Sequence, residues 1–184
     1  EESPWSPGAA SRWWLHHSLA ALDAALRRKG VALTLPRGPA LPALIALARE
    51  AGAGKVVWNR LYDPATVARD TTVKTGLRDK GYECESYNAT LLHEPWEIRT
   101  GQGGPYRVFT PFWRACQMRL DAQPAPLPAP RRLHGPSQPI ASLPLNELDL
   151  LPKIPWDTAF SQLWSPGESG AHRRLEQFCG EWLG

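Results

Sequence analysis

Helices and short strands alternate along the first half of the chain, and this alternation limits the fold more than any other feature. Leucines at helical spacing predict a helix over residues 9–29, ended by Gly30 as a C-terminal cap. Helices joining successive strands about 25 residues apart indicate right-handed crossovers and a parallel sheet. The predicted class is therefore α/β, with further helices over 41–50 and 64–80 and strands over 31–35, 56–58 and 82–87.

The third of these helices carries the clearest boundary signals. Asp63 is suited to cap its N-terminus, Pro64 to occupy its first position, and Gly81 to end it. In the second helix, Pro42 is tolerable because it falls in the first turn.

The second half of the chain has a different texture. Residues 101–105 form a glycine-rich loop, and Thr110 and Pro111 are expected to cap and begin a helix that runs through Leu120. Prolines recur through residues 124–155, which excludes regular structure and predicts an extended connector. Helical character returns from His172 to Leu183. The predicted domains are a sheet domain over 1–121, a connector over 122–163 and the start of a helical domain over 164–184.

Composition excludes several classes of protein. At 184 residues, with 42% hydrophobic and 21% charged residues, the chain suits one globular domain. No apolar stretch approaches the roughly 20 residues of a membrane span, and the N-terminal residues do not resemble a signal peptide. Three scattered cysteines favour reduced thiols, so we expect a cytoplasmic location. The net charge of +3 indicates no nucleic-acid partner by itself.

The common catalytic and metal-binding motifs are missing. Residues 52–55 (Gly-Ala-Gly-Lys) precede a strand instead of joining a strand to a helix, so we interpret them as a turn and not a phosphate loop. His16 and His17 point about 100° apart on a helix and cannot chelate one metal together. We expect no metal site and no catalytic residue in this chain. The basic run Arg27-Arg28-Lys29 is explained by a helix C-terminus, which favours cations, more simply than by a DNA-binding patch.

The end of the second predicted strand is the candidate binding site, by its position in the sheet. Ligands of open parallel sheets bind beyond the carboxyl ends of the strands, near helix N-termini. The candidate ligand-binding residues here are Trp58, Asn59, Arg60, Tyr62 and Asp63. A structural alternative stays open, in which Trp58 packs in the core, Asp63 only caps its helix and Arg60 is solvated. The chain also has nine tryptophans, and those on helices, Trp13, Trp14 and Trp113, are expected to serve in packing.

Several runs together resemble the photolyase/cryptochrome family, in particular bacterial cyclobutane-dimer photolyases related to plant cryptochromes. Each run is weak alone, but they occur in the family's order and cover most of the chain outside the connector. The runs are residues 8–15 (GAASRWWL), 59–64 (NRLYDP) with Arg69-Asp70, 87–96 (YNATLLHEPW), 109–113 (FTPFW) and 164–168 (WSPGE) with Ala171.

The resemblance implies a Rossmann-like domain that often holds an antenna chromophore, followed by a connector and a helical domain that binds FAD. In photolyases the reduced flavin, on absorbing blue light, donates an electron to a pyrimidine dimer flipped out of DNA. The flavin site, the surface for damaged DNA and the family's electron-transfer tryptophans would then lie beyond Gly184. The alternatives are a cryptochrome-like blue-light photoreceptor without repair activity and a freestanding nucleotide-binding module.

Two departures from the family pattern affect these expectations. Some bacterial relatives hold a folate antenna with an Asn-Glu pair, and the matching positions here are Ala65 and Thr66. Another folate mode, a deazaflavin or no antenna therefore remain open. The family's first two strands also have no counterpart before Glu1, although the first is central in the family's 3-2-1-4-5 order.

Without these strands the sheet would leave backbone groups of interior strands unpaired, which is costly. We therefore expect the native gene product to extend N-terminally and the isolated 184 residues to aggregate or fold poorly. Thermal unfolding of the isolated segment checks this prediction, and a sharp two-state transition would contradict it.

Overall fold

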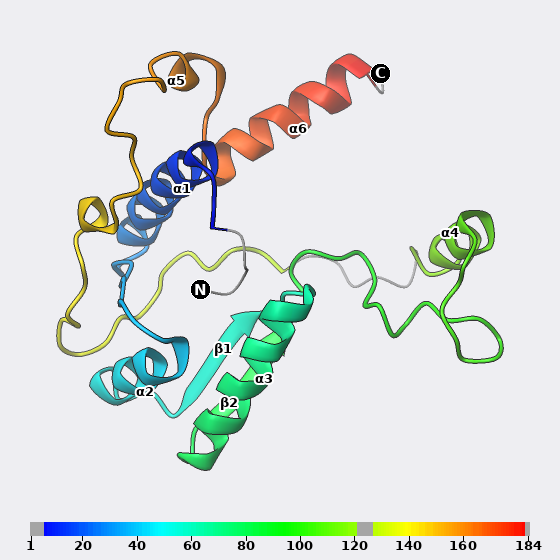
Figure 1. Ribbon diagram of the computed structural model, residues 1–184, viewed down its shortest axis with the longest axis horizontal. Coiled ribbons are helices and arrows are strands. Elements are labelled where there is room, and N and C mark those ends of the chain that lie inside the picture. Colours follow the sequence, from blue (N-terminus) through cyan, green and yellow to red (C-terminus); the bar gives the residue numbers. More distant parts are fainter. Residues whose placement is uncertain (1–5, 121–126, 183–184) are drawn as a thin grey trace.

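The computed structural model describes residues 6–120 and 127–182 (Figure 1). The predicted domain boundary near Asp121, the first prolines of the connector and the predicted helix end at Leu183 lie outside these residues. The elements, in order, are α1 (Ala9–Arg28), α2 (Ala40–Glu50), β1 (Lys55–Asn59), α3 (Pro64–Asp79), β2 (Glu83–Tyr87), α4 (Phe109–Gln117), the 3-10 helix η2 (Leu145–Leu148), α5 (Phe160–Leu163) and α6 (Glu168–Trp182).

A parallel β-α-β unit forms the centre of the fold. β1 pairs with β2 in parallel, from Lys55 opposite Glu83 to Asn59 opposite Tyr87. The crossover helix α3 buries Val73 and Leu77 against Cys84 of β2. α2 packs beside α3, where a Cβ added to Gly76 would lie 2.4 Å from a methyl carbon of Leu41. The predicted α/β class with a parallel sheet is confirmed.

The predicted strand over residues 31–35 is wrong for the described structure, in which this segment is irregular. Its backbone bonds to other groups, because no strand is described beside it. The Leu33 amide donates to Asp23 Oδ1 at 2.9 Å, and the Leu35 amide donates to Ser142 Oγ at 2.8 Å. The outer edge of β1 is likewise unpaired within the described residues, and Val57 on this strand is 56% exposed.

Local sequence signals predicted some helix ends correctly and others wrongly. Gly30 and Gly81 take positive φ angles of 97° and 84° just after α1 and α3, as helix-ending glycines do. α4 begins at Phe109 with Val108 as its N-cap, so the predicted cap at Thr110 is wrong. α4 ends at Gln117, three residues before the predicted end at Leu120. α6 begins at Glu168, four residues before the predicted start at His172.

The connector holds more regular structure than its prolines predict. η2 forms over four residues directly after Pro144, and α5 follows further along the chain. Proline is compatible with a helix when it precedes the first turn, because no backbone N–H is needed there. The expectation of a wholly irregular connector is therefore corrected.

Trp13 of α1 connects this helix to residues 157–160, far along the chain. Its side chain is 2% exposed, and its indole Nε1 donates to Asp157 Oδ2 at 2.9 Å. The ring of Phe160 meets it edge-on at a centroid distance of 5.3 Å. Through these contacts α1 meets the segment around α5, and it also packs against the start of α6, beside which it lies in Figure 1.

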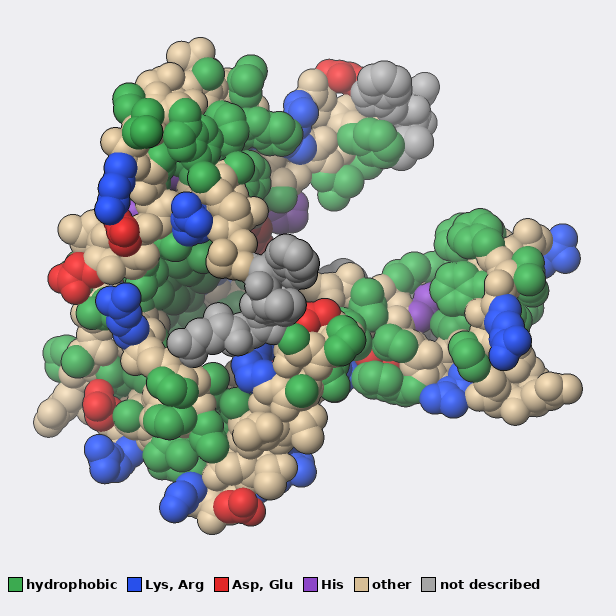
Figure 2. Space-filling model, in the orientation of Figure 1, with side chains coloured by type: hydrophobic (Ala, Val, Ile, Leu, Met, Phe, Trp, Pro, Cys, Tyr) green, Lys and Arg blue, Asp and Glu red, His purple; other side chains and the backbone are tan. Residues whose placement is uncertain are grey.

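The other helical tryptophans are less buried than expected. Trp14 contacts the Trp164 ring but is 42% exposed, and Trp113 stacks on Phe109 with the same exposure. α4 lies at the end of an arm away from the sheet (Figure 1), and hydrophobic side chains gather over it on the face seen in Figure 2. The prediction of tryptophan packing is confirmed only for Trp13.

We expect the Trp13→Ala substitution to reduce stability by about 3–5 kcal/mol, because it removes a large buried ring and leaves Asp157 without its donor. Denaturant unfolding of the full-length protein measures this loss. Trp14→Ala is the matched control on the next residue, and its loss should be clearly smaller. Equal losses for the two variants would contradict the assignment of Trp13 as the buried anchor.

Candidate binding site at the strand ends

Asp63 is engaged at the start of α3. Its Oδ1 accepts the backbone N–H of Thr66 at 3.1 Å, and its other oxygen accepts the Thr66 hydroxyl. These bonds, first from the Thr66 side chain and then from its backbone, hold the pKa of the Asp63 carboxyl below its usual range. The predicted N-cap is confirmed, and the carboxylate occupies the position where a helix N-terminus would otherwise receive an anion.

Trp58 and Asn59 end β1 in different surroundings. Trp58 is half-buried against the core of α3, and its Nε1 donates to Asp70 Oδ2 at 3.0 Å. This position agrees with the structural alternative for Trp58. Asn59 is exposed and donates or accepts no side-chain hydrogen bond within the described residues.

Arg60 is held from several sides just beyond β1. Its Nη1 forms an ion pair with Glu94 Oε1, and its Nη2 donates to the Ser86 carbonyl at 2.6 Å. The guanidinium carbon lies 5.1 Å from the centroid of the Trp96 ring, within the range of a cation–π contact. The side chain is 27% exposed, so the alternative of a solvated Arg60 is not what the structure shows.

Tyr62 shares the same carboxylate. Its hydroxyl donates to Glu94 Oε2 at 2.9 Å, so Glu94 accepts from both Arg60 and Tyr62. Burial raises the pKa of the Tyr62 phenol, and the hydrogen bond to Glu94 raises it further. We call Arg60, Tyr62, Ser86 and Glu94 the Glu94 network.

Glu94 is the residue of this site that sequence reasoning missed. It is 9% exposed although it is charged, and it follows a loop shaped by Asn88. The Asn88 carboxamide oxygen accepts the amides of Thr90 and Leu91, and this turn brings the chain back toward Arg60. In the sequence, Glu94 stands within the run over residues 87–96 that carries the family resemblance, but an acid between His93 and Pro95 does not reveal burial.

The five predicted residues therefore do not form one open site. Arg60 and Tyr62 converge on Glu94, Asp63 caps α3, and Trp58 faces Asp70. The arrangement joins the loop after β2 to the residues after β1. Of these five residues, only Asn59 has a side chain without a hydrogen bond to another described residue.

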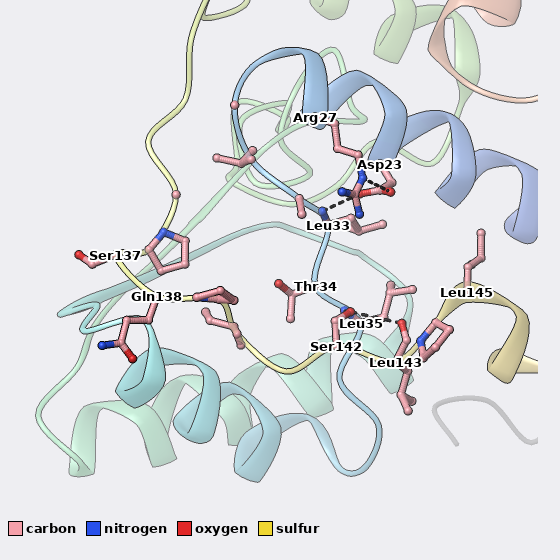
Figure 3. A pocket seen from close by; sticks show the side chains of 18 residues that line it. Asp23, Arg27, Leu33, Thr34, Leu35, Ser137, Gln138, Ser142, Leu143 and Leu145 are labelled. Atoms are coloured by element: carbon pink, nitrogen blue, oxygen red, sulfur yellow. Dashed lines mark hydrogen bonds and ion pairs between the residues drawn. The ribbon is translucent and has the colours of Figure 1, made fainter.

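A cavity of about 650 Å³ lies elsewhere, between the end of α1, the segment over 30–35 and the connector over 135–145 (Figure 3). Its carboxylate, Asp23, already accepts from Arg27 Nε at 2.8 Å and from the Leu33 amide, and both bonds lower the pKa of Asp23. A smaller pocket of about 350 Å³ runs beside the unpaired edge of β1 and includes Trp58 and Asn59.

No cluster of three metal-ligating side chains occurs in the part of the chain that the structure describes. The turn interpretation is confirmed for residues 52–54, which join α2 to β1, and Lys55 begins β1. No described helix is both long enough and apolar enough to cross a membrane.

The chain is similar in sequence and in fold to known proteins that contain a parallel α/β domain. A deoxyribodipyrimidine photo-lyase from Agrobacterium fabrum is 46% identical over 97% of this chain and 37% of its own length. Cryptochrome-2 from Arabidopsis thaliana is 38% identical over the whole chain and 31% of its own length. The crystal structure of a class III photolyase from Agrobacterium tumefaciens superposes with a TM-score of 0.87 at 44% identity, covering 97% of this chain and 37% of that one.

The fold defines the class first: a Rossmann-like α/β domain of the kind found at the N-terminus of photolyases and cryptochromes. The family model for DNA photolyase matches residues 1–131, and the chain belongs to this family. It spans about a third of the length of the curated relatives that it matches.

The Glu94 network predicts a change in the titration of Tyr62. In Glu94→Gln the negative charge disappears while the Arg60 cation stays, so we expect the pKa of Tyr62 to fall toward its usual value. Tyrosinate absorbance of the full-length protein against pH measures it, with Tyr62→Phe as the subtraction that isolates this phenol from the other tyrosines. Glu147→Gln, on exposed η2, is the control. An unchanged Tyr62 pKa in Glu94→Gln would contradict the network.

Proposed function

We propose that this chain is the N-terminal, antenna-type domain of a deoxyribodipyrimidine photolyase, and that the full-length protein repairs pyrimidine dimers in DNA under light. The observation that carries the proposal is the match to a photolyase at 46% identity over 97% of the chain. The photolyase match is closer than the cryptochrome match at 38% identity.

We propose that FAD is held outside this segment. A dinucleotide in an α/β domain places its pyrophosphate on the helix N-terminus that follows a strand. After β1 that position belongs to the N-terminus of α3, where the Asp63 carboxylate already takes the Thr66 amide and would repel a phosphate. The residues described therefore do not fit a flavin pyrophosphate at this strand end.

For an antenna chromophore, folate or deazaflavin, we propose a narrower form of the strand-end site. Arg60, Tyr62 and Asp63 shape the edge through their internal bonds, and Asn59 supplies the free polar contact. Trp58 lies next to it on β1. The proposal rests on the exposure of Asn59 at the carboxyl end of β1, where ligands of parallel sheets bind.

Light-dependent repair of an oligonucleotide that contains a pyrimidine dimer tests the proposed function directly. We expect the purified full-length protein to restore the undamaged strand under blue light and not in the dark. No repair in either condition would favour the second candidate, a cryptochrome-like photoreceptor, which the match to Cryptochrome-2 over the whole chain supports.

The absorption spectrum of the natively purified full-length protein tests the chromophore site. If a second chromophore is present beside flavin, we expect Asn59→Ala to lower its ratio to protein severalfold, because the substitution removes the free amide. Asn146→Ala is the matched control, since Asn146 is also exposed but lies on η2. An Asn59→Ala ratio equal to that of the wild type would contradict the site.

A further inference from the structure

Two basic runs that are about a hundred residues apart in sequence lie side by side. The Lys29 ammonium donates to the Pro130 carbonyl at 2.6 Å, and the Leu133 amide donates to the Lys29 carbonyl at 2.8 Å. These two bonds bracket Arg131 and Arg132. The connector therefore holds both arginines beside the end of α1, where Arg28 and Lys29 are located.

The backbone of the connector approaches the residues after α1 closely at two glycines. A Cβ added to Gly30 would lie 3.3 Å from the Leu133 carbonyl oxygen, and Gly30 has a φ of 97°. A Cβ on Gly135 would lie 3.4 Å from a methyl carbon of Val31. A larger residue at Gly30 would strain the turn and crowd the connector, so glycine permits the contact.

The four side chains form what we call the basic patch: Arg28, Lys29, Arg131 and Arg132. Arg28, Arg131 and Arg132 are exposed, and none of the four makes an ion pair within the described residues. The nearby acid Asp23 is already paired with Arg27. The negative end of the α1 dipole accounts for Arg28 and Lys29, but not for arginines delivered by a connector.

We propose that the basic patch binds the phosphodiester backbone of duplex DNA without regard to sequence, an inference that rests on the proposed DNA-repair function. Three of the four cations are arginines, whose planar guanidinium matches two phosphate oxygens at once. Contacts of this kind position a protein on DNA and carry no sequence information. The patch is therefore a contact additional to the lesion-binding surface.

The salt dependence of binding to an undamaged duplex tests this proposal in the full-length protein. Each phosphate contact contributes about −0.9 to the slope of log affinity against log salt concentration. We expect Arg131→Ala/Arg132→Ala to make the slope shallower by about 2, so that the affinity lost between 50 and 200 mM salt shrinks about tenfold. Arg131→Lys/Arg132→Lys should keep most of the slope.

The matched control is Arg78→Ala/Lys80→Ala, which removes two exposed cations at the end of α3, another helix C-terminus. Its slope should equal that of the wild type. The proposal is overturned if the patch variant keeps the wild-type slope, or if the control changes as much. It is also overturned if the patch variant loses affinity only for anionic lipid vesicles.

Light-dependent repair is measured on the same preparations, which separates the two proposals. A wild type that binds DNA through the patch but repairs no dimer contradicts the proposed function alone. A repair-active wild type whose slope does not depend on Arg131 and Arg132 contradicts the patch alone.

Discussion

The packing of α3 on the parallel pair of strands is the constraint on which the strand-end geometry depends. Leu77 is fully buried against Cys84, and this fixes β1 beside β2 in a single register. That register places Asn59 opposite Tyr87, so Arg60 lies next to Ser86 and its backbone amide donates to the Tyr87 carbonyl at 2.8 Å. The carboxyl ends of both strands, and the loops that follow them, consequently meet at one edge.

Glu94 gives this edge its chemical character. A carboxylate that is only 9% exposed is stable when cationic and hydroxyl donors replace its water, and Arg60 and Tyr62 supply both. Arg60 and Tyr62, which were expected to bind a ligand, therefore hold the loop after β2 in place through Glu94. This distinguishes the side chains that build the edge from Asn59, which the edge presents to solvent.

Features encoded by neighbouring residues could be predicted from the sequence. Asp63 followed by Pro64, and the glycines at 30 and 81, mark helix ends through local backbone chemistry, and all three predictions are confirmed. Features that depend on distant partners could not be predicted. The segment over 31–35 can form a strand only beside a paired neighbour. Glu94 can be buried only because Arg60 pairs with it. The run that contains Arg131 reaches Lys29 only because the connector folds back.

The claim that Arg60 and Glu94 form one internal unit is tested most directly by a double-mutant cycle on the free energy of unfolding of the full-length protein. We expect Arg60→Ala and Glu94→Ala each to destabilise the protein, and the double variant to lose less than the sum of the two losses by a coupling of about 0.5–3 kcal/mol. Strictly additive losses would contradict it, because Arg60 would then be independent of Glu94.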